Sequence, residues 1–287
     1  MSNKNRINSQ QRTEQILAAL TVCQLDAAQL LKLSQTFDEP FNGKLYVLRK
    51  MNKLKKNGLV YEYTFPDRCK YWKLSREGYR HVYGPDKPIP TKPSVYRAIR
   101  PAVERHARRL ADLLVQIQLA AFRSGAEIMY LYGDHQCSLK HDGATKVPDA
   151  IVGLKLRGRK TYTIVFELDC GTEPVYSQKS RDSLDQLIRF YLAHEASHDT
   201  SYRVVTVFER ATVRVEHFLD RVEQNSQDSR RRVIKAVTLD RLLAYQNPLQ
   251  EPILLDYDRQ VSAMLPGNES VAQTIPAGIL DSVAMAG

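Results

Sequence analysis

Three acidic side chains lie close together in the stretch VPDAIVGLKLRGRKTYTIVFELDCGTE, residues 147–173: Asp149, Glu167 and Asp169. The segment TYTIVFELD predicts a β-strand, in which side chains alternate between the two faces of a sheet. Glu167 and Asp169 are therefore expected on one face. If VPDAIVGLKL is the neighbouring antiparallel strand, joined through the turn RGR, Asp149 at its start lies near the end of its partner.

Carboxylates gathered in this way repel one another unless a cation lies between them. Their hard oxygen atoms suit Mg²⁺ or Mn²⁺, which activates a water molecule and stabilises the transition state of phosphoryl transfer. The structural alternative is a buried carboxylate set that pairs with Arg or Lys from a neighbouring helix. Both interpretations, a metal site and an ion-pair cluster, fit the residues.

The segments around the carboxylates predict a helix, three strands, a helix and a strand, followed by a further helix and strand. The segments are AIRPAVERHARRLADLLVQIQLAAFRSG, EIMYLYG, VPDAIVGLKL, KTYTIVFELD, SQKSRDSLDQLIRFYLAHEA, YRVVTVF, ATVRVEHFLDRVEQ and RRVIKAVTLDRLL. This αβββαβ order indicates an α/β (α+β) domain with a mixed sheet and helices on its faces, over residues 97–245. Residues 246–287 are expected to form a C-terminal extension that is largely flexible.

Positive charge is concentrated in the first hundred residues. They hold 19 Lys and Arg against 8 Asp and Glu, whereas the remaining residues hold 23 basic and 24 acidic side chains. Essentially all of the net charge of +10 therefore belongs to the N-terminal part of the chain. This distribution predicts a polyanion-binding module there, followed by a domain with another task.

The N-terminal part predicts three helices followed by a hairpin. The helices are expected at RTEQILAAL, LDAAQLLKL and KLYVLRKMNKLKKNGLV, and the hairpin at LVYEYTF and KYWKLS around PDRC. In the third helix, Leu45, Leu48, Met51 and Leu54 are predicted to face the core, while basic residues occupy the other side.

This order is that of a winged helix, and LRKMNKLKKNGLV with YWKLSREGYR resembles the third helix and the wing of that family. The resemblance implies a DNA-binding domain over residues 13–82, whose third helix enters the major groove. The positions expected to face DNA are Lys44, Arg49, Lys50, Lys53 and Lys56 on the helix, with Arg68 and Lys70 at the tip of the wing. A solvated lysine face or a wing that binds protein is the alternative.

Residues 83–96 hold four prolines and predict a stiff, extended linker between two domains, while residues 1–12 are expected to be a flexible N-terminus. The four cysteines are far apart and form no CxxC pair, which favours reduced thiols without structural zinc. No segment approaches the length of apolar sequence that a membrane helix needs, so a cytoplasmic protein without a membrane partner is expected.

Pro148-Asp149, followed by Glu167-x-Asp169 on the next strand, resembles the signature of the PD-(D/E)XK nuclease superfamily. A winged helix joined to PDA…FELDxGTE and KSRDSLDQLIRFY further resembles the replication-relaxation family, which is encoded on plasmids and other mobile elements. The two resemblances cover most of residues 13–245. They imply Mg²⁺- or Mn²⁺-dependent phosphodiester chemistry on double-stranded DNA, with Asp149 and Glu167 as metal ligands.

The chain departs from that signature at one position. The lysine of the superfamily, two residues after the glutamate, is here Asp169. Since that lysine helps to position the attacking water, Asp169 is either a further metal ligand or the mark of lost catalysis. Lys179, early in the next helix, is the expected replacement cation. The predicted catalytic set is therefore Asp149, Glu167, Asp169 and Lys179, of which the three acids are the predicted metal ligands.

The leading hypothesis is a DNA-binding protein of a plasmid or other mobile element whose nuclease-like domain is a Mg²⁺-dependent DNA endonuclease or nickase. The alternative is a catalytically inactive, nuclease-like accessory or regulatory factor for replication, transfer or transcription. Double-stranded DNA is the predicted partner in both. Replication or transfer proteins of the same element and a second copy of the chain are further candidate partners.

Overall fold

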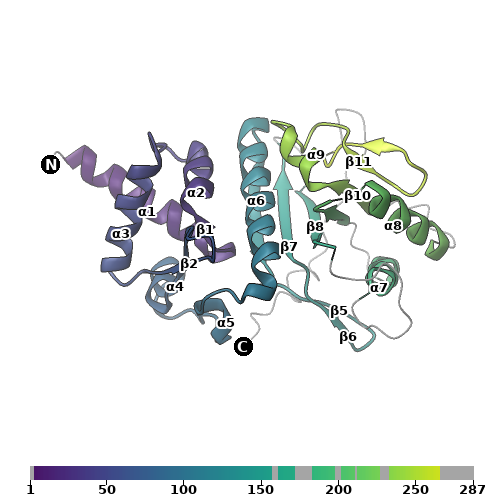
Figure 1. The fold of residues 1–287 in the computed structure, drawn as a ribbon, viewed down its shortest axis with the longest axis horizontal. Coiled ribbons are helices and arrows are strands. Elements are labelled where there is room, and N and C mark those ends of the chain that lie inside the picture. Colours follow the sequence, from purple (N-terminus) through teal and green to yellow (C-terminus); the bar gives the residue numbers. More distant parts are fainter. Residues whose placement is uncertain are drawn as a thin grey trace. The chain divides into compact units, whose positions relative to one another are not determined.

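The computed structural model describes residues 3–156, 161–171, 183–197, 202–210, 212–226 and 233–265, and the chain divides into two compact units (Figure 1). The division lies between Leu119 and Ala120, inside the long helix α6 (Pro101–Ser124). Sequence analysis placed the boundary within residues 83–96. The difference arises because Ala111, Val115 and Leu119, spaced one turn apart on α6, are buried in the core of the N-terminal unit.

The N-terminal unit combines helices with a small antiparallel sheet of order β1-β3-β2. Its elements before α6 are α1 (Asn3–Val22), β1 (Leu25–Asp26), α2 (Ala27–Leu33), the 3-10 helix η1 (Ser34–Thr36), α3 (Lys44–Lys56), β2 (Val60–Thr64), β3 (Lys70–Leu74), α4 (Arg76–Tyr83) and α5 (Pro93–Tyr96). Because α1 begins at Asn3, most of the segment 1–12, expected to be flexible, is helical. Arg12 at the end of this segment donates to the carbonyl oxygen of Glu39 at 2.9 Å.

Local signals in the sequence set the ends of the next two helices. The carboxylate of Asp26 accepts hydrogen bonds from the amides of Ala28 and Gln29, and the Gln29 side chain accepts from the amide of Asp26. This reciprocal capping box starts α2. Helix α3 stops at Asn57 and Gly58, where Gly58 adopts a φ of 73° that a residue with a side chain rarely reaches.

The core side of α3 differs from the predicted one by part of a turn. Val47, Met51 and Leu54 are buried, at the i, i+4, i+7 spacing of one helix face. Met51 and Leu54 were predicted to be buried, but Leu45 is 56% exposed and Leu48 only partly buried. The predicted spacing of three residues drifts around a helix of 3.6 residues per turn, and Val47 takes the inward position instead.

Residues 83–96, the expected linker, are packed against the N-terminal unit. Val95 and Tyr96 in α5 are buried and belong to its core. The hydroxyl of Tyr63 donates to the carbonyl oxygen of Tyr96, and Lys73 donates to that of Ser94 at 2.7 Å. The prolines therefore stiffen a segment that contacts β2 and β3 and contributes two buried apolar side chains to the core of this unit.

The second unit is a mixed α/β fold, as predicted, with a seven-stranded sheet of order β12-β11-β10-β9-β8-β7-β4. Its elements after α6 are β4 (Glu127–Gly133), β5 (Leu139–His141), β6 (Ala144–Lys146), β7 (Ala150–Lys155), β8 (Thr161–Asp169), α7 (Leu184–Ser197), β9 (Tyr202–Phe208), α8 (Thr212–Asn225), β10 (Ile234–Thr238), α9 (Leu239–Ala244), β11 (Leu254–Leu255) and β12 (Val261–Ser262). Strands β8, β9 and β10 are parallel, whereas the remaining neighbours in the sheet are antiparallel. The pairing of β4 with β7 shifts register between Ile128 and Tyr130.

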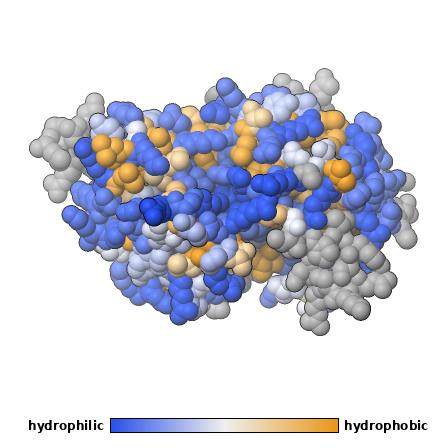
Figure 2. Space-filling view, viewed as in Figure 1, coloured by the Kyte–Doolittle hydropathy of each residue, from blue (hydrophilic) through white to orange (hydrophobic). Residues whose placement is uncertain are grey.

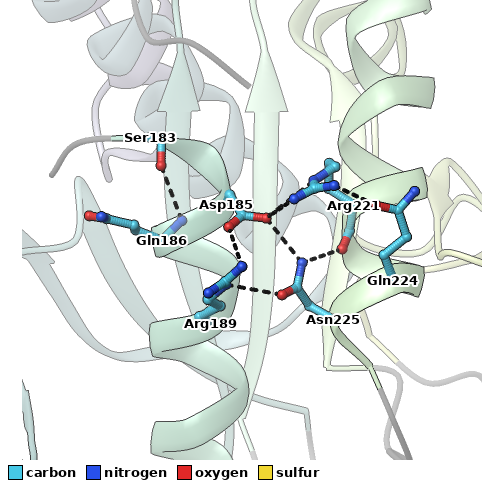
Figure 3. A network of polar contacts seen from close by, with 7 residues as sticks. All are labelled: Ser183, Asp185, Gln186, Arg189, Arg221, Gln224 and Asn225. Atoms are coloured by element: carbon cyan, nitrogen blue, oxygen red, sulfur yellow. Dashed lines mark hydrogen bonds and ion pairs between the residues drawn. The ribbon is translucent and has the colours of Figure 1, made fainter. Parts of the chain in front are cut away.

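Helices α7 and α8 pack on the face of the sheet that carries Val165, and Tyr191 and Phe218 from these helices join its buried core. A polar network ties the two helices to one another (Figure 3). The buried carboxylate of Asp185 on α7 receives the guanidinium of Arg221 on α8, at 2.7 Å between Nη2 and Oδ1, and that of Arg189 at 3.0 Å. The network fixes how α7 lies across the strands beneath it.

Residues 246–265 contribute two short strands to the sheet, which corrects the expectation of flexibility for this part of the C-terminal extension. Strands β11 and β12 continue the sheet beyond β10, and Leu254 is fully buried. The buried ammonium of Lys235 pairs with Asp256 at 3.0 Å, and Arg203 donates to the carbonyl oxygens of Ala263 and Met264. These contacts are long-range in sequence, so local hydrophobic periodicity did not indicate them. Residues 266–287 lie outside the described residues.

The surface in view in Figure 2 is largely hydrophilic, with hydrophobic residues gathered in small, separate patches. None of the described helices combines the length and hydrophobicity required to cross a membrane.

Candidate functional site

Asp149, the residue before β7, lies beside the end of β8 that carries Glu167. The antiparallel register of β7 and β8 pairs Ala150 with Phe166, so one step further along both segments brings Asp149 near Glu167. The backbone amide of Leu168 donates a hydrogen bond to Asp149, with 2.6 Å between N and Oδ2. The antiparallel pairing on which the sequence-based hypothesis depended is therefore present, and it brings Asp149 close to the end of β8 that carries Glu167.

The carboxylate of Glu167 is buried and held by side chains from two other elements. The hydroxyl of Tyr191 on α7 donates to Oε1 of Glu167 at 2.5 Å, and Nζ of Lys146, at the end of β6, lies 3.7 Å from the same oxygen. Burial, followed by the charge of Glu167, raises the pKa of Tyr191 well above its usual value. Tyr191 therefore keeps its proton at neutral pH. It donates its hydrogen bond to Glu167 and so orients this carboxylate.

A buried hydroxyl lies beside this pair. Thr206 on β9 is the register partner of Glu167 on β8, and because the two strands are parallel their side chains point to the same face. Thr206 is 0% exposed, and its hydroxyl oxygen has no hydrogen-bond partner among the described residues. Since buried polar atoms are nearly always hydrogen-bonded, a water molecule or an ion beside Glu167 would satisfy it.

Asp169 is engaged differently from the way the metal-site hypothesis predicted. The guanidinium of Arg214 on α8 donates to both of its carboxylate oxygens, with 3.0 Å between Nη2 and Oδ1, and the amide of Gly171 donates to Oδ1 at 2.8 Å. The Asp169 side chain is 2% exposed. This bidentate pair corresponds to the structural alternative, in which an arginine from a neighbouring helix binds the carboxylate.

The described part of the chain contains no group of three or more His, Cys, Asp and Glu side chains arranged to hold a metal ion. The structure thus brings together two of the three predicted ligands, Asp149 and Glu167, and commits Asp169 to Arg214. Two carboxylates on or beside neighbouring strands, with the Thr206 hydroxyl beside Glu167, still fit a hard divalent cation, because Mg²⁺ keeps several water ligands and needs only one or two protein carboxylates.

Lys179, the expected cation of the catalytic set, lies outside the described residues. Lys146 is instead the lysine that lies against Glu167, and sequence reasoning did not single it out. It reaches the site on the β5–β6 hairpin, where Asp142 and Gly143 both have positive φ, 45° and 77°. Asp-Gly between two short strands is a strong hairpin signal, and it was the available clue to this element.

The solvent side of α3 carries most of the residues predicted to face DNA. Lys44, Arg49, Lys53 and Lys56 are all exposed, and Arg49, Lys53 and Lys56 lie opposite the buried side of the helix. Tyr46 is exposed as well, with the Arg49 guanidinium 5.8 Å from the centre of its ring. The helix therefore presents four cations and an aromatic ring to solvent.

Lys50 does not belong to this exposed face. Its ammonium donates to the carbonyl oxygen of Ser9 on α1 at 2.8 Å. Burial, together with the charges of Lys53 and Arg12, lowers the pKa of Lys50 to about 8. The prediction that Lys50 faces DNA is therefore corrected: on the helical wheel it lies at the border of the core side, where it reaches α1.

The tip of the β2–β3 hairpin exposes Arg68, which adopts a positive φ of 65°. Lys70 is exposed too but pairs with Glu62 at 3.2 Å. Beside Arg68, Asp67 accepts two hydrogen bonds from Arg108 on α6, at 2.6 and 2.8 Å, and these lower the pKa of Asp67 to about 2. The hairpin tip is thereby fixed to α6 while Arg68 remains at the surface.

Comparisons with models of protein families, with curated proteins and with solved structures give no significant match. Functional conclusions therefore rest on the residues and geometry described above.

Proposed function

We propose that the chain is a DNA-binding protein whose second unit is a metal-dependent nuclease of the PD-(D/E)XK type and whose N-terminal unit is a winged helix. The order α1, β1, α2, α3, β2, β3 with the sheet β1-β3-β2 supports the winged-helix assignment. The mixed sheet with acidic residues on β8 and just before β7 supports the nuclease assignment. Membership of the replication-relaxation family, with its association with mobile elements, is part of this proposal and rests on the sequence resemblance.

One observation carries the nuclease proposal: Asp149 lies beside the end of β8 that carries Glu167, with the buried Thr206 hydroxyl as the neighbour of Glu167 on the adjoining strand. Asp149 is partly exposed, whereas Glu167 is buried. Tyr191 holds Oε1 of Glu167, which fixes the orientation of this carboxylate within the sheet face. Such fixed oxygen ligands are what a hard divalent cation requires.

In this proposal Asp149 and Glu167 hold Mg²⁺ or Mn²⁺. The bound cation would supply Lewis acidity toward a phosphate oxygen and lower the pKa of an attacking water. Tyr191 and the Leu168 amide hold the two carboxylates in place through the reaction. Glu167 lies on strand β8 and Asp149 directly before β7, and placement on or beside strands suits a site that must be held to within a fraction of an ångström.

DNA would be engaged by α3 and the hairpin tip. Exposed Lys44, Arg49, Lys53 and Lys56 form a cationic surface on one helix, and Arg68 adds a charge at the hairpin. Each phosphate contact releases counterions, so such binding weakens as salt rises. The exposed ring of Tyr46, beside Arg49, offers an apolar contact to a base edge or sugar.

Cleavage is tested on supercoiled plasmid and linear duplex DNA with Mg²⁺ or Mn²⁺. Glu167→Gln removes the charge and retains an acceptor for Tyr191, and Asp142→Asn, at the exposed hairpin turn, is the matched control. We expect wild type and Asp142→Asn to cut or nick DNA, and Glu167→Gln to be slower by about a hundredfold or more. Equal rates for wild type and Glu167→Gln would reject the nuclease proposal.

DNA binding is tested separately with the double variant Lys53→Glu, Lys56→Glu. The control, Lys87→Glu with Lys92→Glu, makes the same change in net charge at exposed positions in residues 83–96. We expect the α3 variant to bind more weakly and to lose about two from the slope of log affinity against log salt. Binding that responds equally to both double variants would place the DNA contact elsewhere.

A second candidate function is DNA binding without hydrolysis, as in an accessory or regulatory factor. The Asp169–Arg214 pair favours it, because the position where the superfamily has a catalytic lysine is here part of a buried ion pair. This candidate predicts salt-sensitive DNA binding through α3 together with identical background cleavage by wild type and Glu167→Gln.

A further inference from the structure

The β5–β6 hairpin holds Lys146 near Glu167, one member of the acidic pair. In the hairpin register Lys146 is opposite Leu139, which is 1% exposed and buried in the core with α7. His141, at the end of β5, accepts or donates a hydrogen bond with Ser197 of α7, at 3.0 Å between Nδ1 and Oγ. Because the hairpin is anchored at both positions, the backbone of Lys146 is fixed three residues before Asp149.

The side chain of Lys146 is held less firmly than its backbone. Its ammonium lies 3.7 Å from Glu167 Oε1, beyond hydrogen-bond distance, and the side chain is 32% exposed. Arg214, the cation at Asp169, instead makes a bidentate contact. A lysine ammonium is a compact charge on a flexible stem, so Lys146 can leave Glu167 without any movement of the hairpin.

We propose that Lys146 is an exchangeable counter-ion: it compensates the Asp149–Glu167 pair until a divalent cation enters, and it then contacts the phosphate of the bound nucleic acid. This inference rests on the proposed function and assigns the cation of that same site to Lys146. The lysine and the cation share one pair of carboxylates. Two positive charges within a few ångströms oppose each other, so each lowers the affinity of the pair for the other.

Loss of Lys146 should affect metal binding and cleavage in opposite directions. Removing Lys146 eliminates the competing charge and tightens metal binding, and because it also removes the phosphate contact, it slows cleavage. A purely structural lysine would change neither metal affinity nor the metal-saturated rate in this opposed way. The opposed signs therefore distinguish an exchangeable counter-ion from a residue that only supports the fold.

The test titrates Mn²⁺ into the full-length protein, without DNA, by isothermal calorimetry. Lys146→Met is compared with Lys146→Arg, which retains the charge, and with Lys140→Met, an exposed lysine on the same hairpin. We expect Lys146→Met to bind Mn²⁺ about five- to tenfold more tightly than wild type, and the other two variants to bind as wild type does. Cleavage at saturating Mn²⁺ is then measured for all four proteins, with Lys146→Met expected to be the slowest.

The outcomes separate the two proposals. If wild type binds Mn²⁺ and Lys146→Met binds it no more tightly, or Lys140→Met shows the same gain, the counter-ion role of Lys146 is wrong while the metal site stands. If Lys146→Met binds more tightly but no protein cuts DNA, Lys146 is the counter-ion of a metal site that does not hydrolyse DNA. If none of the four proteins binds Mn²⁺, both the metal-dependent function and the role of Lys146 are rejected.

Discussion

Replacing Arg214 by methionine tests whether Asp169 is held by a structural ion pair. The Asp169 side chain is 2% exposed, and without the guanidinium its carboxylate keeps the Gly171 amide at 2.8 Å as a hydrogen-bond donor. Breaking a buried pair in this way costs about 3–5 kcal/mol. Since the Arg214 side chain is 21% exposed, water reaches the vacated space, and we expect the lower end, about 3 kcal/mol. For a unit of this size that lowers Tm by about 6–12 °C.

The position of the single tryptophan allows unfolding of the N-terminal unit to be followed separately from that of the second unit. Trp72 is buried in the N-terminal unit, so its fluorescence reports unfolding there, whereas hydrogen exchange of peptides from β8 and β9 reports the second unit. Arg214→Met should lower the stability of β8 and β9 while the fluorescence transition stays in place. The control is Arg189→Met: Arg189 is 63% exposed, and its partner Asp185 keeps Arg221, so a loss below about 1 kcal/mol is expected.

Two results would refute this reasoning. Equal losses for Arg214→Met and Arg189→Met would mean that Arg214 does not compensate a buried charge at Asp169. The substitution Asp169→Asn provides the second result. If Asp169 serves only as the ion-pair partner of Arg214, this substitution leaves the Mn²⁺ affinity unchanged. A clear loss of Mn²⁺ affinity in Asp169→Asn would return this residue to the metal ligands, as the sequence-based hypothesis had it.

Three further predictions follow from buried ionisable groups. The pKa of Lys50 is about 8 in the folded protein, whereas its usual value is 10.5, so the unfolded chain binds more protons between these two pH values. The free energy of unfolding of wild type should therefore rise relative to that of Lys50→Met as pH increases from 7 to 10, as measured by urea unfolding. Burial and nearby acids raise the pKa of Cys137, so in the native protein it should react with iodoacetamide more slowly than the less buried Cys23 from pH 7 to 9, read out by mass spectrometry. Asp256→Asn leaves the buried ammonium of Lys235 without its partner carboxylate at 3.0 Å, and thermal unfolding should show a loss of about 3 kcal/mol that Lys235→Met largely reverses in the double variant.

The sequence was informative where structure depends on neighbours along the chain. The alternation in TYTIVFELD predicted a strand with Glu167 and Asp169 on one face, and the short connection to the preceding strand predicted the antiparallel pairing that aligns Asp149. Contacts between distant segments were not predictable in this way. Tyr191 reaches Glu167 from α7 and Arg214 reaches Asp169 from α8, and no spacing rule indicates which polar residue of a helix meets a given strand.

Lys146 and residues 246–265 illustrate two different reasons for failure. Lys146 was missed although the Asp142-Gly143 turn indicates a hairpin, because no strand was expected between EIMYLYG and VPDAIVGLKL. Strands β11 and β12 are only two residues long, and their place in the sheet depends on Lys235, Arg203 and buried side chains such as Leu254. A strand of two residues is too short for alternation to reveal it.

The same two-residue strands determine how the sheet ends. One edge of the seven-stranded sheet is β12, which presents too few backbone groups to guide the addition of another strand. The opposite edge is β4, where the register shift between Ile128 and Tyr130 interrupts the ladder. Both edges are therefore poor templates for strand-to-strand association. If two copies of the chain assemble, side chains on a helical or loop surface must form the contact, and the sheet remains confined to one molecule.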